Sequence, residues 1–204
     1  MTAHRPDPSG PARIGPNSII RMAEALREQQ GEARTAELFA AAGLAAYLAT
    51  PPETMVLEEE VIRLHHAVRA GIGLDAAARA GWDAGRRTGE YLLARRIPKP
   101  AQAVLKLLPP GPAARILLKA IGQHAWTFAG SGRFSYELGH PLRITIENCP
   151  TARDAQADQP LCAFYTGTFQ RIFTELVSRK TEVREIACAA TGAPACVFEL
   201  RWKE

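Results

Sequence analysis

Apolar side chains recur every three or four residues through the first 125 positions, the spacing typical of amphipathic helices. The pattern predicts helices over residues 17–31, 32–48, 57–72 and 74–97. Five prolines between Pro98 and Pro112 then divide the chain into a short helix, a break and a further apolar helix over 113–123. We therefore expect the first half of the protein to be helical.

After Trp126 the alternation shortens to every second residue, which is typical of strands. It predicts two strands, an amphipathic helix and a terminal hairpin, over residues 127–138 and 142–148, then 161–179, then 181–188 and 196–202. Helices come first and strands pair late. The expected fold class is α+β, with N-terminal helices packed on a small antiparallel sheet.

Composition narrows the possible classes of protein. The chain carries 25 basic and 21 acidic residues, a formal net charge of +4, without a block of like charges, so we expect no nucleic-acid partner. Residues 1–16 lack an apolar core and are rich in proline and glycine, which predicts a disordered arm ahead of a helical region over 17–73. No stretch is long and apolar enough for a transmembrane segment, and we expect a cytoplasmic location.

The cysteines raise the question of a metal. Cys162 precedes the amphipathic helix, while Cys188 and Cys196 flank the turn of the terminal hairpin. Packing of the helix end against the hairpin end would gather all three, and zinc takes about four such ligands in tetrahedral array. Glu185 would supply the fourth if its strand bulges, and Cys149 is the other candidate. The alternative is that the cysteines are ordinary core residues.

These residues lie in a pattern that resembles the vinyl-4-reductase domain family, named for bacteriochlorophyll 4-vinyl reductase. The resemblance is carried by "ARAGWDAGRRTGEYL", "NCP", "PLCAFYTGTFQRIFTEL" and "VREIACAATGAPACVFEL". It implies a small-molecule-binding domain over residues 74–204, with a fold similar to that of TRAPP subunits. Phenol-sensing members imply a structural zinc at the spacing C-x22-E-x2-C-x7-C, matched here by Cys162, Glu185, Cys188 and Cys196. Cys149 is then left outside the metal shell.

The resemblance also implies a role in bacteriochlorophyll synthesis. We expect a protein that binds a magnesium tetrapyrrole intermediate and acts as carrier or assembly factor for the pathway enzymes. The alternatives are the vinyl reductase itself and a ligand-sensing regulatory module. A reductase needs a source of electrons, but no G-x-G-x-x-G follows a strand and one zinc would occupy three of the four cysteines. No redox cofactor is therefore predicted, and enzymatic activity is left open.

Candidate ligand-binding residues lie near the apolar segment 101–126, which would offer surface to a flat ring or form core. His124 and Trp126 stand where this segment meets the first strand, and Arg133 would pair with a carboxylate. We interpret "RLHHAVR", residues 63–69, as a solvated helix face. Small residues between positions 77 and 89 allow close helix pairing, and we expect them to join two copies in a homodimer.

Overall fold

The structure, a computed structural model, describes residues 10–202. Its α-helices are α1 (Asn17–Ala41), α2 (Ala46–Ala49), α3 (Glu58–Ile72), α4 (Leu74–Arg95), α5 (Lys99–Leu107), α6 (Pro110–Gln123), α7 (Trp126–Ala129) and α8 (Ala163–Leu176). Its strands are β1 (Arg13–Ile14), β2 (Val56–Leu57), β3 (Arg133–Glu137), β4 (Leu142–Glu147), β5 (Glu182–Ala187) and β6 (Cys196–Arg201). The predicted α+β class, with an antiparallel sheet, is confirmed.

Helix boundaries fall close to the predicted positions because their signals are local. Gly73, with φ of 77°, separates α3 from α4, and Pro110 begins α6. At Gly31 the structure differs from the prediction of two helices. This residue has φ of 82° and kinks α1 without ending it, and only the short α2 follows. Chain direction changes at Gly31, while helical hydrogen bonding resumes directly afterwards.

The N-terminal arm is shorter than expected. Residues 1–9 lie outside the described part, but residues 10–16 differ from the predicted disorder. Arg13 and Ile14 form β1, which pairs antiparallel with β2, and the Ile14 side chain is buried in the core. The Gly15 N–H also donates to the Thr127 carbonyl at 2.7 Å. Burial of one isoleucine and a strand pairing therefore fasten the chain to the helical region.

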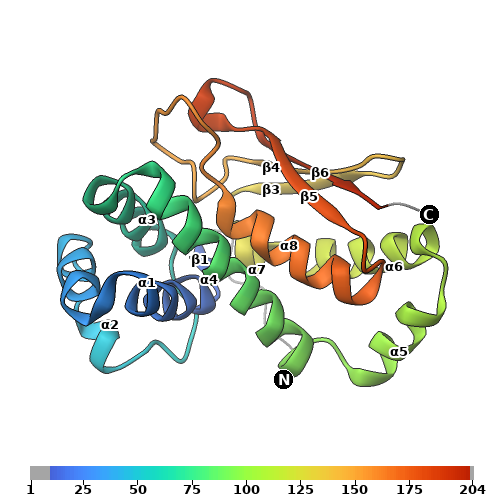
Figure 1. Cartoon of the computed structure of the whole chain (residues 1–204), viewed down its shortest axis with the longest axis horizontal. Helices are drawn as coiled ribbons and strands as arrows, with labels where there is room; N and C mark the ends of the chain where they lie inside the picture. Colours follow the sequence, from blue (N-terminus) through green and yellow to red (C-terminus); the bar gives the residue numbers. More distant parts are fainter. Residues whose placement is uncertain (1–9, 203–204) are drawn as a thin grey trace.

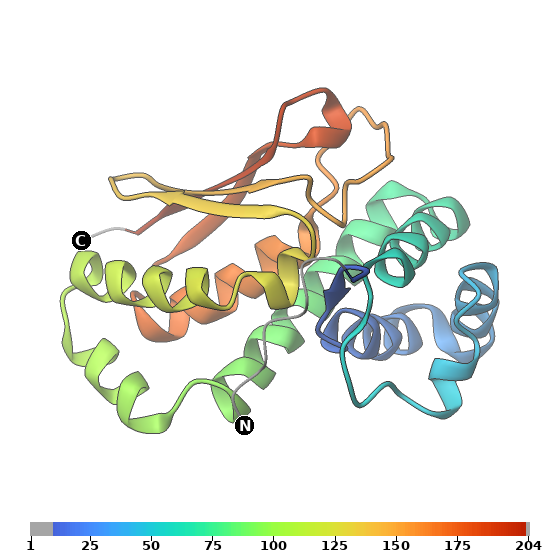
Figure 2. The same cartoon turned by 180° about the vertical axis from the view of Figure 1, so that it is seen from behind.

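The larger sheet has the order β3-β4-β6-β5, with every neighbouring pair antiparallel. Alternate residues such as Ile144, Ile146 and Phe198 are buried on one face. Helices α6 and α8 lie beneath this face in both views (Figures 1 and 2). The opposite face carries exposed charged residues, among them Arg143 and Arg184. The main core therefore lies between the sheet and the helices.

The first predicted strand begins later than expected. Residues 126–129 form α7 instead, and β3 starts only at Arg133. The Thr127 hydroxyl donates to the His124 carbonyl at 2.7 Å, a local bond that competes with strand pairing. Gly130, with φ of 58°, ends the helical turn. Local hydrogen bonding therefore outweighs the alternating pattern at this point.

Helix α4 lies directly against α8. A Cβ placed on Gly85 would lie 1.9 Å from the Phe164 carbonyl oxygen, so the two backbones are in contact. The Thr168 hydroxyl lies 3.0 Å from the Gly85 carbonyl and bridges the helices. The small-residue face between positions 77 and 89 is thus covered by α8 of the same chain. The homodimer stays a prediction, without this face as its interface.

Membrane crossing requires a long helix with few polar residues. Among residues 10–202, no helix combines the length and apolar character that such a crossing needs.

Candidate metal centre

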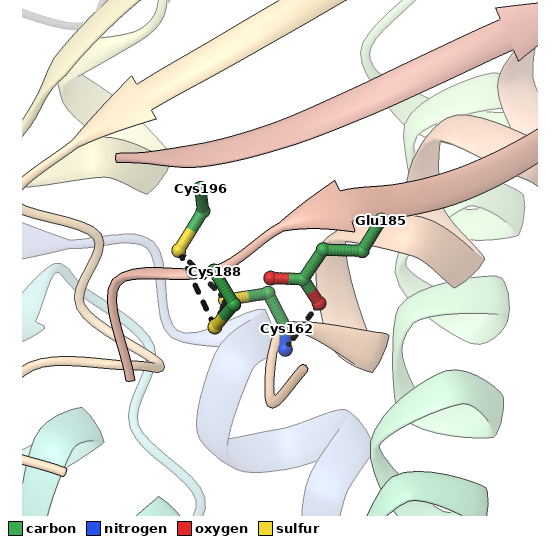
Figure 3. A group of neighbouring side chains, drawn as sticks. All are labelled: Cys162, Glu185, Cys188 and Cys196. Carbon is green, nitrogen blue, oxygen red and sulfur yellow. Dashed lines mark hydrogen bonds between the residues drawn. The ribbon is translucent and has the colours of Figure 1, made fainter. Parts of the chain in front are cut away.

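Four potential metal ligands converge where the N-terminus of α8 meets the hairpin of β5 and β6 (Figure 3). Cys162 immediately precedes α8, and Glu185 lies on β5. Cys188 follows β5 at the start of a short 3₁₀ turn, and Cys196 is the first residue of β6. Residues separated by up to 34 positions are therefore brought together by one helix end and one hairpin end.

The distances between the sulfur atoms suit a single small ion. The Sγ atom of Cys162 lies 3.3 Å from that of Cys196 and 4.0 Å from that of Cys188. The Sγ atoms of Cys188 and Cys196 are 3.8 Å apart. Thiolates bound to one tetrahedral zinc lie about 3.8 Å from each other. All four donor atoms fall within 4.8 Å of one another, and the cysteines are not joined as disulfides.

Glu185 completes the donor set through an irregularity in its strand. The register of β5 against β6 shifts between Glu185 and Ala187, which is the bulge that the metal hypothesis requires. Its Oε2 accepts a hydrogen bond from the Cys162 N–H at 2.8 Å. Its Oε1 is buried and has no hydrogen-bond partner within the described part of the chain. A cation among the thiols would satisfy that oxygen, so the residues present fit a metal.

Backbone amides point at the sulfur atoms. The Leu161 N–H donates to Cys188 Sγ, and the Ala189 N–H donates to Cys196 Sγ, each at 3.4 Å. Such bonds stabilise a thiolate relative to a thiol, as outer-shell donors do around metal sites. Burial lowers the pKa of the nearby Arg69, while the neighbouring cysteine charges act in the opposite direction. These surroundings favour negative charge on sulfur.

Without a cation, burial disfavours the ionised ligands. Burial raises the pKa of Glu185 to about 8, with the charge of Cys188 adding to the effect. Burial likewise raises the pKa of the Cys162 thiol. A divalent ion favours the ionised forms instead, so metal binding here is coupled to proton release.

Cys149 lies beside this group but is not one of the four. It is buried, with its Sγ 3.5 Å from Cys162 Sγ and 3.5 Å from the Thr151 hydroxyl. The group whose donor atoms all lie within ligand range contains the other three cysteines and Glu185. The structure therefore places Cys149 next to the proposed metal shell, in contact with one of its members.

The candidate tetrapyrrole-binding residues lie in one stretch of the chain, far from the thiols in sequence. His124 is exposed at the end of α6, and Trp126, which is half-buried, begins α7. Arg133 is exposed on β3, where its guanidinium already binds both carboxylate oxygens of Glu147 across the sheet. That ion pair raises the pKa of Arg133. A ligand carboxylate would have to compete with Glu147 for it.

Comparisons with known proteins agree on one family. The vinyl-4-reductase domain matches residues 142–202. The bacteriochlorophyll synthase 23 kDa chain of Cereibacter sphaeroides is 41% identical over 204 residues, covering 98% of each protein. The protein of the same name from Rhodobacter capsulatus is 39% identical over 192 residues, covering 94% of this chain and 88% of the relative. The chain belongs to this family. The resemblance to the vinyl-4-reductase domain is thereby confirmed.

Within this bacteriochlorophyll synthase 23 kDa family, the matched domain region holds all four candidate ligands, since they lie between residues 142 and 202. Among solved structures, an H-NOX protein from K. algicida has a TM-score of 0.61 and is 10% identical, covering 94% of this chain and 97% of its own. At that identity the likeness shows the fold alone.

His65 is a buried residue for which we wrongly expected a solvated helix face. Its side chain is 6% exposed on α3 and packs edge-on against Phe164 of α8. Its Nε2 has no hydrogen-bond partner among residues 10–202. The signal was present in the sequence: His65 follows Val61 by four positions and precedes Val68 by three, which places it on the apolar side of the helix.

Acid should destabilise this family member through His65. Burial lowers its pKa from 6.5 to about 3, so the folded state binds a proton less readily than the unfolded chain. The contribution of neutral His65 is fully present above pH 6.5 and is lost as pH falls toward 3, by up to about 1.4 kcal/mol per pH unit. Urea unfolding of the wild type and of His65→Gln from about pH 7 to about pH 4 measures the difference. Parallel pH profiles for the two proteins would contradict the assignment.

Proposed function

We propose that the chain takes part in bacteriochlorophyll synthesis as a carrier or assembly factor, which binds a magnesium tetrapyrrole intermediate and presents it to the pathway enzymes. The observation that carries this proposal is the 41% identity, over almost the whole of both chains, to a protein named as one chain of bacteriochlorophyll synthase. A separately named chain supports a role beside other proteins. The pigment itself is a magnesium tetrapyrrole, which is the class of ligand proposed.

The metal centre is proposed to hold one structural zinc. Three sulfur donors and one carboxylate form a closed set of four, which suits tetrahedral zinc and leaves no open position for substrate. Zinc also carries no electrons. Its proposed role is to fasten the N-terminus of α8 to the β5–β6 hairpin, because thiolate ligation contributes directly to folding.

His124 is the proposed axial ligand of the magnesium. Its Nδ1 lies 2.9 Å from the Ala120 carbonyl oxygen, which can only accept a hydrogen bond. Nδ1 therefore carries the proton, and in the neutral ring the lone pair lies on Nε2. The exposed position leaves Nε2 free to approach a metal in a flat ring. Trp126, two residues further on, would offer an aromatic face, and Arg133 would exchange Glu147 for a ligand carboxylate at small cost, because exposed ion pairs are weak.

Porphyrin titration tests the proposed ligand site. The wild type should bind magnesium protoporphyrin more tightly than metal-free protoporphyrin, with a shift of the absorption bands, because only the metal can accept Nε2. His124→Ala should remove this preference. His140→Ala is the matched control, since His140 is another exposed histidine, stacked on Trp202 at 5.2 Å. Equal affinity for both porphyrins in the wild type would contradict axial ligation by His124.

Carrier and reductase are separated by a turnover experiment. The purified protein is incubated without oxygen with a divinyl magnesium tetrapyrrole and NADPH or reduced ferredoxin, and the pigments are separated by chromatography. A carrier returns the divinyl compound unchanged. Monovinyl product in proportion to the amount of protein would defeat the carrier proposal and favour the reductase alternative.

A further inference from the structure

Helix α5 carries an apolar stripe that faces away from the protein. Its inward side holds the buried Gln102 and Leu105. On the opposite side, Ala103, Val104 and Leu107 are all exposed, together with Pro100. These positions follow the i, i+3, i+4, i+7 spacing of a single helix face. The side chain of Leu107 is 86% exposed and that of Val104 is 56% exposed, which leaves a branched apolar pair in water.

Positive charge surrounds this stripe. Between Tyr91 and Tyr136 the sequence contains no aspartate or glutamate. The same stretch contains seven basic residues: Arg95, Arg96, Lys99, Lys106, Arg115, Lys119 and Arg133. Among the described residues, ion pairs occupy only Lys106, with Glu175, and Arg133, with Glu147. The other five basic residues are exposed, so α5 presents apolar side chains inside an unneutralised basic region.

We propose that the outer face of α5 docks on an anionic membrane surface, with Val104 and Leu107 entering the lipid headgroup region. A short amphipathic helix lying in the interface requires an apolar face and flanking basic residues, and α5 has both. Each basic residue near an anionic leaflet contributes about 1 kcal/mol. The stripe is not needed for the fold, because its side chains contact little of the protein. In Figure 1, α5 lies at one end of the molecule, away from the sheet.

Other occupants fit less well. A second copy would bring the same basic region against itself, and like charges oppose such pairing. A stable protein interface covers about 800 Å² on each partner, whereas α5 is a helix of nine residues with four outward apolar side chains. A bilayer needs no matching shape, only an apolar interior beneath negative charge. The charge and the size of the face therefore favour lipid.

Vesicle sedimentation tests the proposal. The full chain should pellet with phosphatidylcholine vesicles that contain phosphatidylglycerol, but not with phosphatidylcholine alone, and added salt should weaken the binding. Leu107→Ser should lower the binding about tenfold, because one exposed leucine no longer enters the lipid. Leu138→Ser is the matched control: Leu138 is 44% exposed next to the end of β3, outside the acid-free stretch, and its replacement should change nothing.

The charge requirement has its own variants. Arg96→Glu combined with Lys99→Glu should abolish binding to the anionic vesicles, and both positions are exposed, so the fold should be kept. Circular dichroism checks that it is. Binding to neutral vesicles alone, no binding at all, or equal losses in Leu107→Ser and Leu138→Ser would each overturn the proposal. So would a dimer that Leu107→Ser dissociates without any vesicle binding, since this would assign the face to a second copy.

Discussion

Replacing Cys188 by serine is expected to release the bound metal and to destabilise the protein by roughly 3 kcal/mol or more, which lowers the melting temperature by about 10 °C. The reason is the position of Cys188: its Sγ lies within 4.0 Å of the sulfur atoms of Cys162 and Cys196, at the contact between α8 and the hairpin. Metal analysis and thermal unfolding of protein made without a metal-binding tag measure both effects. The wild type should carry about one zinc per chain.

Cys149→Ser is the matched control for this experiment. Cys149 is equally buried and contacts Cys162 Sγ at 3.5 Å, but it lies outside the group of four donors. We expect it to lose some stability through its buried position while retaining the metal. If Cys149→Ser lost the zinc and Cys188→Ser kept it, the proposed ligand set would be wrong. If neither protein contained metal, the thiols would be core residues, as the alternative from the sequence had it.

Gly85→Ala is expected to disrupt the contact between α4 and α8. The added Cβ would lie 1.9 Å from the Phe164 carbonyl oxygen and 3.0 Å from the Thr168 backbone nitrogen, so the backbone of α8 must move. Overpacking of this kind costs roughly 3 kcal/mol when backbone rather than a side chain has to shift. Because Cys162 directly precedes α8, the shift should also weaken metal binding. Urea unfolding and competition with a zinc chelator measure the two effects.

Gly81→Ala, one helical turn earlier, is the control. A Cβ on Gly81 would meet the Phe164 nitrogen at 3.6 Å and the Ala163 Cβ at 3.7 Å, which are ordinary contacts. Alanine favours a helix over glycine by up to about 1 kcal/mol, so this variant should be neutral or slightly more stable. Equal destabilisation by both substitutions would contradict a specific close approach at Gly85.

The proposed zinc and the proposed membrane face lie on different elements, so their tests are independent. Loss of zinc acts on α8 and the hairpin, whereas the exposed face of α5 contributes little to the packing. A variant that loses metal should unfold more readily, while Leu107→Ser should unfold like the wild type. The two sets of variants thus separate stability from surface binding.

Sequence alone determined the order of the elements, the fold class and the family, because these depend on short-range patterns. Hydrophobic spacing predicted α3, α4, α6 and α8 to within a few residues. The spacing of three cysteines and Glu185 indicated a shared site before any coordinates, since a ligand motif is written in intervals along the chain. Local signals failed only where another local interaction was stronger, as at α7, or where a kink replaced a helix end, as at Gly31.

Tertiary structure decided which faces are used, because that depends on what each element packs against. The small residues of α4 would suit a second copy or a neighbouring helix, and only the fold shows that α8 of the same chain covers them. His65 is buried since α8 closes over α3 at that point. The apolar residues of α5 suited either core or a ligand surface in the sequence, yet Val104 and Leu107 face water. A periodic pattern specifies that a face exists, whereas long-range packing specifies what covers it.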